Sequence, residues 1–188
     1  ADEPWQEPSP SAPGWHKDGD WFRHFLDSPE QGLLTIIIWS DIQAQSGGTF
    51  VATDSVAPVA RYLHQHPQGC HPAETQFGRL VDACEAFDEV TGEVGDVFLL
   101  HPFLLHAASN NPSGRARFIT NPPVSLREPM CFSRADGDFS PVERGVLCAL
   151  EPGPVDFRIT GERERVVPER IARQQRMLAE QKARLRQA

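Results

Sequence analysis

Apolar and polar residues alternate in blocks along this chain, and the apolar blocks have the length of strands. Residues 33–39 (LLTIIIW) form a continuous, β-branched run, which predicts a buried central strand. After a turn at Ser46-Gly47-Gly48, the pattern predicts a second strand at residues 49–53. Residues 87–90 and 97–100 flank the sequence TGEVGD, which indicates that these two strands form a hairpin.

Helices are indicated at three places between and after the strands. Pro58 is expected to be the first residue of a helix that ends near Pro67, and a shorter helix is expected at residues 80–84. Ser140-Pro141-Val142-Glu143 is a capping box, in which the Ser and Glu side chains each bond the other residue's backbone N–H. The helix that follows has an apolar face and is expected to end at residues 151–153; the face consists of Val142, Val146, Leu147 and Leu150.

The two ends of the chain differ from its middle. Residues 1–13 are polar and rich in proline, so we expect an irregular arm. Residues 162–186 contain eight Lys/Arg and four Asp/Glu, and a long basic helix is predicted from Pro168 onward. Ile171, Leu178 and Leu185 recur every seven residues, but this stripe is too narrow for a strong coiled coil. We therefore expect the helix to lie on its own acidic domain in a monomer, with a weak homodimer through the helix as the alternative.

Composition narrows the class of protein. The 188 residues suit one domain, divided into an arm (1–13), a core domain (14–160) and a C-terminal helix (161–188). The net charge of −8 argues against nonspecific binding to nucleic acid, and no run is long enough to cross a membrane. No charged-then-apolar leader is present, and the four cysteines are dispersed, so we expect a cytoplasmic protein with reduced thiols. Cys70-His71 matches no zinc-ligand spacing and is interpreted as part of a solvated loop.

The triplet His16-Lys17-Asp18 is the first candidate for metal chemistry. Alternate residues of a strand point to the same face, so His16 and Asp18 can reach one ion together. Gly14 before the triplet and Gly19 after it indicate the end of a strand bounded by loops. With a second imidazole, these ligands would leave three positions open on one face of Fe(II), the arrangement that suits oxygen activation.

Two histidines could supply the second imidazole. His106 ends an apolar run and precedes small residues that leave room for a cofactor, whereas His101 lies in the middle of the run and suits a core position. The turn at residues 110–114 is expected to send the chain back as a strand adjacent to His106, at 115–121, which ends at Pro122. Arg117 would then lie level with the ligands and hold the carboxylate of a co-substrate; His101 with Arg115 is the alternative pair.

These motifs together resemble the phytanoyl-CoA dioxygenase family of Fe(II)/2-oxoglutarate-dependent oxygenases. The resemblance spans residues 14–124 through GWHKDGD, IIIWSDIQAQSGGTFVATDS, GDVFLLHP and HAASNNPSGRARF. It implies a mainly β fold with flanking helices, built on a double-stranded β-helix (jelly-roll, cupin-like) core. It also implies Fe(II) held by His16, Asp18 and His106, the 2-oxoglutarate carboxylate paired with Arg117, and Trp39 beside the co-substrate.

The resemblance implies a dioxygenase that uses O2 to hydroxylate a small organic substrate and releases succinate and CO2. The carboxylate of Asp18 argues against halogenation, because related halogenases leave that position empty for chloride. Phe22, Arg23 and His24 follow the iron loop and are candidates for the substrate mouth, or for packing on the domain. A catalytically silent jelly-roll and a cupin-like metalloenzyme without 2-oxoglutarate are the alternatives. Family members have a core strand before the H-x-D motif, and only fifteen residues precede His16, so we expect an N-terminally incomplete domain.

Overall fold

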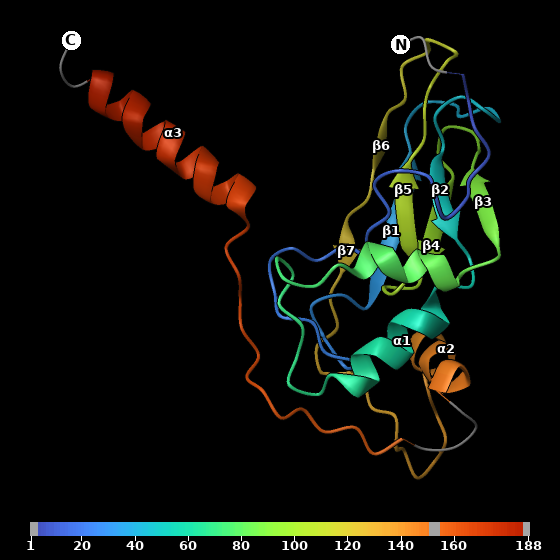
Figure 1. Cartoon of the computed structure of the whole chain (residues 1–188), viewed down its shortest axis with the longest axis vertical. Coiled ribbons are helices and arrows are strands. Elements are labelled where there is room, and N and C mark those ends of the chain that lie inside the picture. The colour runs from blue at the N-terminus through green and yellow to red at the C-terminus, as the bar shows by residue number, and fades with distance from the viewer. Residues whose placement is uncertain (1–3, 151–154, 186–188) are drawn as a thin grey trace.

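Two antiparallel sheets face each other in the computed structural model, which describes residues 4–150 and 155–185 (Figure 1). In one sheet β1 lies between β4 and a pair of short strands; its members are β4 (Val97–Leu100), β1 (Leu33–Ile38), β6 (Ile119–Thr120) and β7 (Pro123–Val124). In the other sheet the order is β3 (Phe87–Val90), β2 (Thr49–Ala52) and β5 (Leu105–Ala108). The helices are α1 (Val56–Gln65), the 3-10 helix η1 (Phe77–Ala83), α2 (Pro141–Leu150) and α3 (Glu169–Leu185).

The space between the sheets is filled by one face of each. Ile36 of β1 comes from one sheet and Val51 of β2 from the other, and both are buried in one cluster with Val90 and Leu104. The opposite face of β2 carries Phe50, which packs into a larger core with α1, α2 and η1. The β3-β2-β5 sheet is therefore buried on both faces, and residues of alternate parity on β2 and β5 point to different layers.

The structure describes about 25% of residues as helix and about 19% as strand, so the expected "mainly β" composition is wrong. Most strands have only two to four residues, and long connections separate them. The helices also contribute much of the larger core rather than flanking a finished barrel. The part of the chain that the structure describes contains no helix long and apolar enough to span a bilayer.

The predicted hairpin at TGEVGD is also wrong, although both of its strands exist. β3 pairs with β2 and β4 pairs with β1, so the chain changes sheets between them. Before the turn, Gly92 pairs with Ile42; after it, the carbonyl of Asp96 accepts from the Ile38 N–H at 3.0 Å. A tight turn is present, but the strands before and after it pair with different strands rather than with each other.

The predicted strand at residues 115–121 is shorter in the structure. Only β6 is regular there, because the Ser40 hydroxyl bonds the Ala116 carbonyl (3.3 Å) and the Phe118 N–H (2.8 Å) in place of ladder bonds. Nor do the prolines end the pairing: β7 continues along β1, with Pro123 opposite Leu34. At this end of β1 the missing proline N–H is tolerated, since no further strand lies beyond β7 among the described residues.

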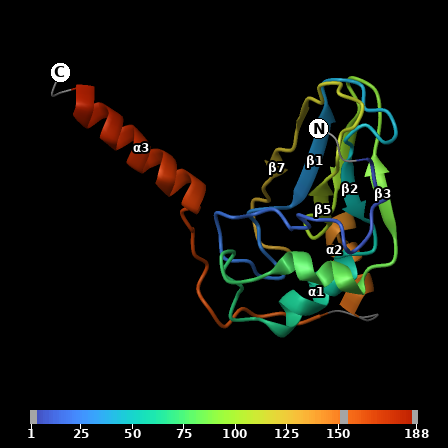
Figure 2. The same cartoon turned by 45° about the horizontal axis from the view of Figure 1, so that its top comes forward.

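The two ends of the chain have different outcomes. The described part of the arm, residues 4–13, is irregular as expected, and Trp5 packs its ring against Phe50. The helix α3 projects from the domain, and none of its described residues is buried, so the expectation that it lies on its own domain is wrong (Figures 1 and 2). Its narrow apolar stripe offers too little area to dock. The predicted helix end at 151–153 lies outside the described residues.

The segment before α3, residues 160–168, follows the surface of the domain and is called the strap below. Its Thr160 N–H donates to the Pro67 carbonyl at 2.8 Å, and its Val166 N–H donates to the Trp21 carbonyl at 2.8 Å. An ion pair of 2.7 Å joins Arg163 of the strap to Asp27. The strap therefore fastens the loop that follows the H-x-D motif.

Candidate metal centre

His16 and His106 come together although they lie on distant parts of the chain. They form an isolated antiparallel bridge, in which each backbone N–H donates to the other's carbonyl at 3.0 Å. Their rings are 4.3 Å apart between centroids. His106 belongs to β5 and lies opposite Val51, so its side chain points into the space between the sheets. The bridge fixes both backbones before any ion binds.

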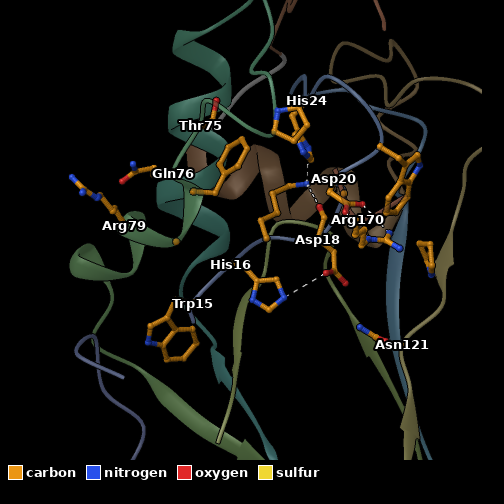
Figure 3. A pocket seen from close by; sticks show the side chains of 17 residues that line it. Trp15, His16, Asp18, Asp20, His24, Thr75, Gln76, Arg79, Asn121 and Arg170 are labelled. Carbon is orange, nitrogen blue, oxygen red and sulfur yellow. Dashed lines mark hydrogen bonds and ion pairs between the residues drawn. The ribbon is translucent and has the colours of Figure 1, made fainter. Parts of the chain in front are cut away.

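Both imidazoles are held in the same tautomer. The Nδ1–H of His16 donates to the Gly14 carbonyl at 2.8 Å, and the Nδ1–H of His106 donates to the Leu104 carbonyl at 3.2 Å. Each ring therefore directs the lone pair of Nε2 away from its own backbone. Both Nε2 atoms lie 3.6 Å from Oδ1 of Asp18 (Figure 3 shows the His16 contact). Such outer hydrogen bonds are the ones that orient metal-ligating histidines.

The charge state of Asp18 suits a ligand. Burial raises the pKa of its carboxyl, but the nearby imidazoles of His106 and His16 outweigh burial and hold the pKa below its usual range. The carboxylate in turn raises the pKa of His16 above its ordinary value, although burial of the ring opposes that shift. Asp18 is thus ionised at neutral pH and already faces two nitrogen lone pairs.

These three residues fit a divalent ion. Their ligand atoms all lie within 4.8 Å of one another, and they are the one such group of His, Cys, Asp or Glu within residues 4–150 and 155–185. Buried Nε2 of His106 has no hydrogen-bond partner in the protein, which an ion would supply. Two ligands about 2.1 Å from an ion at right angles lie about 3 Å apart, so the 3.6 Å contacts need only a small contraction.

His101, the alternative ligand, is occupied elsewhere. Its Nδ1 accepts from the Phe103 N–H at 3.0 Å, and its Nε2–H donates to the Val142 carbonyl of α2 at 3.1 Å. Burial lowers the pKa of His101 to about 4. His101 is therefore a neutral core residue that ties the β4–β5 connection to α2, and His106 is the histidine that joins His16 and Asp18.

Arg117 reaches the inner space from the opposite sheet. The expectation that residues 115–121 form a strand adjacent to His106 is wrong: β6 pairs with β1, and β5 pairs with β2. Arg117 shares the parity of Ile119, which packs between the sheets, and its Nη1 donates to Thr49 Oγ1 at 3.3 Å. Burial lowers the pKa of Arg117, which stays ionised at neutral pH. Arg115, in contrast, is exposed and donates to Gln43.

Register places Arg117 relative to the metal ligands. Thr49 lies two residues along β2 from Val51, the partner of His106. Two residues of a strand span about 7 Å, and residues of equal parity share a face. The guanidinium thus binds a residue on the face that carries His106, about 7 Å along β2 from the partner of His106.

Trp39 is not brought to this group. Ile36 and Ile38 of β1 point inward, so Trp39 points to the outer face of the sheet, where its side chain is 57% exposed. Its Nε1–H donates to Thr120 Oγ1 at 3.0 Å. Successive residues of a strand point to opposite faces, so Trp39 lies on the face opposite to Ile38. A sequence motif does not reveal which face is the inner one.

The tentative substrate residues are also separated. Phe22 is fully buried, and Arg23 is paired with Glu164 of the strap at 3.0 Å. Only His24 lines the pocket described below, and its burial lowers its pKa well below the ordinary value, with the positive charge of Lys17 adding to the effect. Packing on the domain therefore accounts for Phe22 and Arg23.

Lys17, between the two expected ligands, is a residue whose role the sequence did not reveal. Its Nζ donates to three acceptors: Asp18 O at 3.2 Å, His24 Nδ1 at 3.0 Å and Gln31 Oε1 at 3.1 Å. Burial lowers the pKa of Lys17 to about 7. Its ammonium also lies 5.7–5.8 Å from the centroids of three phenyl rings, those of Phe22, Phe77 and Phe103. The inward direction follows from alternation, because His16 and Asp18 point the other way.

A pocket of about 770 Å³ opens in front of His16 and Asp18 (Figure 3). Its walls come from the H-x-D loop, from the start of η1 and the segment before it, from the connection between β6 and β7, and from the start of α3. They include Trp15, Trp21, Phe77, Arg79, Asn121 and Arg170. This volume suits a small organic molecule.

The remaining sequence candidates form no second centre. All four cysteines are free thiols, as expected, and Cys70 pairs its backbone with His24 rather than binding with His71. No protein-family model, curated protein or solved structure matches the chain significantly.

Proposed function

We propose that this chain is an Fe(II)/2-oxoglutarate-dependent dioxygenase that hydroxylates a small organic substrate. The observation that carries the proposal is the tautomer of the two histidines. Both Nδ1–H groups are bound by backbone carbonyls, and both Nε2 atoms face one ionised carboxylate at 3.6 Å. Two imidazoles and one carboxylate on one side of a pocket are the ligand set of non-haem iron oxygenases.

The fold assigned with this function is a double-stranded β-helix. Two facing antiparallel sheets, with His106 and Arg117 directed between them, support this assignment. The sheet that contains β5 would extend through the His16–His106 bridge, which adds the H-x-D segment at its edge.

Arg117 supports 2-oxoglutarate as the co-substrate. Its guanidinium binds Thr49, which lies about 7 Å along β2 from the partner of His106, a spacing that suits the far carboxylate of a five-carbon dicarboxylate whose other end is at the ion. Within the described residues, Arg117 makes no ion pair and only one side-chain hydrogen bond, to neutral Thr49. A half-buried cation without a counter-ion is costly, and a bound carboxylate would remove that cost.

The residues then have separate roles. His16, Asp18 and His106 would hold the iron, and Arg117 would fix the distal carboxylate. Iron with 2-oxoglutarate supplies the oxidation itself: O2, 2-oxoglutarate and a substrate C–H give succinate, CO2 and the alcohol. The pocket walls position the substrate in front of His16 and Asp18 and keep bulk water from the reacting carbon.

The proposal is tested by adding Fe(II) and 2-oxoglutarate to the protein without oxygen and recording the visible charge-transfer band of the chelate. We expect a band in the wild type and in His64→Ala, a matched variant of an exposed histidine, and no band in His106→Ala or Asp18→Ala. A folded wild type without the band would instead favour a silent jelly-roll. Iron binding without a 2-oxoglutarate effect would favour the cupin-like alternative.

A further inference from the structure

The pocket in front of the candidate metal centre differs in charge from the rest of the molecule. The chain has a net charge of −8, yet arginines and carboxylates are equal in number on the pocket wall: Arg79 and Arg170 with Asp18 and Asp20. A bound divalent ion would therefore give this wall an excess of positive charge. An anionic substrate would be drawn to it.

Arg170 keeps hydrogen-bond donors that are not used by its ion pair with Asp20. Its Nε and Nη2 bind the two carboxylate oxygens of Asp20 at 2.9 and 3.2 Å, and its Nη1 has no partner within the described residues. This arginine comes from the first turn of α3, and the strap holds it beside the H-x-D loop (Figure 3). Asp20 thus orients a guanidinium that can still donate to a ligand.

Arg79 stands at the rim on the other side of the pocket, with His16 and Asp18 between the two arginines (Figure 3). Its side chain makes no ion pair or hydrogen bond with the part of the chain that the structure describes. Because Arg79 lies across the pocket from Arg170, the two guanidinium groups cannot share one carboxylate, and Arg79 provides a control arginine in the same wall.

Between the arginines the pocket has apolar walls, to which Trp15, Trp21 and Phe77 contribute. We propose that the substrate is a small organic acid, whose apolar part packs on these rings and whose carboxylate binds Arg170. This inference rests on the proposed function, because it treats the pocket as the substrate entrance of that site. It makes Arg170, which lies outside the two sheets, a specificity-determining residue.

The test compares hexanoate with hexanamide, which differ in charge but little in shape. Trp15 and Trp21 line the pocket, so binding is followed by tryptophan fluorescence at low ionic strength. The protein is kept free of metal, so that hexanoate cannot bind as a metal ligand. We expect hexanoate to bind about fivefold more tightly than hexanamide, the value of one exposed ion pair.

Arg170→Gln is expected to reduce this preference to about twofold or less, whereas Arg79→Gln, on the other side of the pocket, should leave it unchanged. Arg127→Gln, which changes an exposed arginine outside the pocket, should leave it unchanged. Equal binding of the two probes, no binding of either, or an unchanged preference in Arg170→Gln would overturn the proposal. The iron and 2-oxoglutarate band of the wild type is measured separately, so failure of the proposed function is distinguished from failure of this inference.

Discussion

Two histidines of the same apolar run, His101 and His106, differ in how many of their ring nitrogens are hydrogen-bonded within the protein. His101 uses both ring nitrogens within the protein, whereas His106 uses only Nδ1 and leaves a buried Nε2 without a partner. A buried polar atom without a partner is costly unless something binds it. The sequence favoured His106 on the small residues that follow it, and the orphaned nitrogen gives a physical reason for that choice.

His101 leads to a prediction about pH and stability. Its folded pKa is about 4, below the ordinary value of 6.5, so the unfolded chain binds more protons between these values. The free energy of unfolding should therefore fall as the pH decreases from about 6.5 to about 4, by up to about 3 kcal/mol. Urea unfolding across this range should show a smaller decrease in His101→Gln, and an undiminished one in His64→Gln. Equal decreases in His101→Gln and the wild type would contradict the assignment.

Arg117 leads to a prediction about the co-substrate. In Arg117→Gln the distal carboxylate loses a charged partner, so the 2-oxoglutarate concentration at half-saturation of the band should rise roughly tenfold to a hundredfold. Iron affinity should change little, because Arg117 contacts none of the metal ligands. Arg115→Gln is the matched control, since that arginine is exposed and donates to Gln43. A larger effect in Arg115→Gln would move the role to that residue.

At the scale of elements, the capping box at the start of α2 is confirmed. The Glu143 carboxylate accepts from the Ser140 N–H at 2.8 Å, and the Glu143 N–H donates to the Ser140 hydroxyl at 3.2 Å. The same carboxylate also accepts from the Cys131 N–H at 2.7 Å and pairs with Arg134 at 3.0 Å. One side chain therefore ends a loop, starts a helix and is almost completely buried.

We expect Glu143→Gln to lower the free energy of unfolding by about 2 kcal/mol, because it weakens charged hydrogen bonds in a buried position. Glu128→Gln, at an exposed glutamate, should change it by less than about 0.5 kcal/mol. Both values come from urea unfolding at neutral pH. A similar small change in both variants would mean that Glu143 is not essential to the cap.

The positions of several elements were predictable, but their partners were not. The apolar pattern predicted β1 and β2, and the turn sequence TGEVGD predicted β3 and β4, to within a residue, because burial, β-branching and turn preferences act locally. Which strand lies beside which depends on contacts between distant residues, so the hairpin and the strand next to His106 were assigned incorrectly. The grouping of His16, Asp18 and His106 was anticipated, whereas the inward Lys17 and the outward Trp39 depend on parity within the tertiary fold.

At the scale of the whole molecule, the C-terminal region divides into a bound strap and a free helix. Removing residues 172–188 should change the free energy of unfolding by less than about 0.5 kcal/mol, because no described residue of α3 is buried. Arg163→Ala should lower it by about 3 kcal/mol, since it leaves the partly buried Asp27 without its counter-ion. Thermal or urea unfolding measures both. A strongly destabilised truncation would show that α3 packs on the domain in solution.

The bridge between His16 and His106 has a consequence for the cohesion of the molecule. The two residues are 90 positions apart (106 minus 16), and an ion bound to both would act as a cross-link that closes this long loop. Because the unfolded chain cannot hold its ligands in place, the ion would favour the folded state, by about 2.7 kcal/mol at a hundred times its dissociation constant. The melting temperature should therefore rise with the concentration of free metal, and a chelator should make the chain more sensitive to proteolysis.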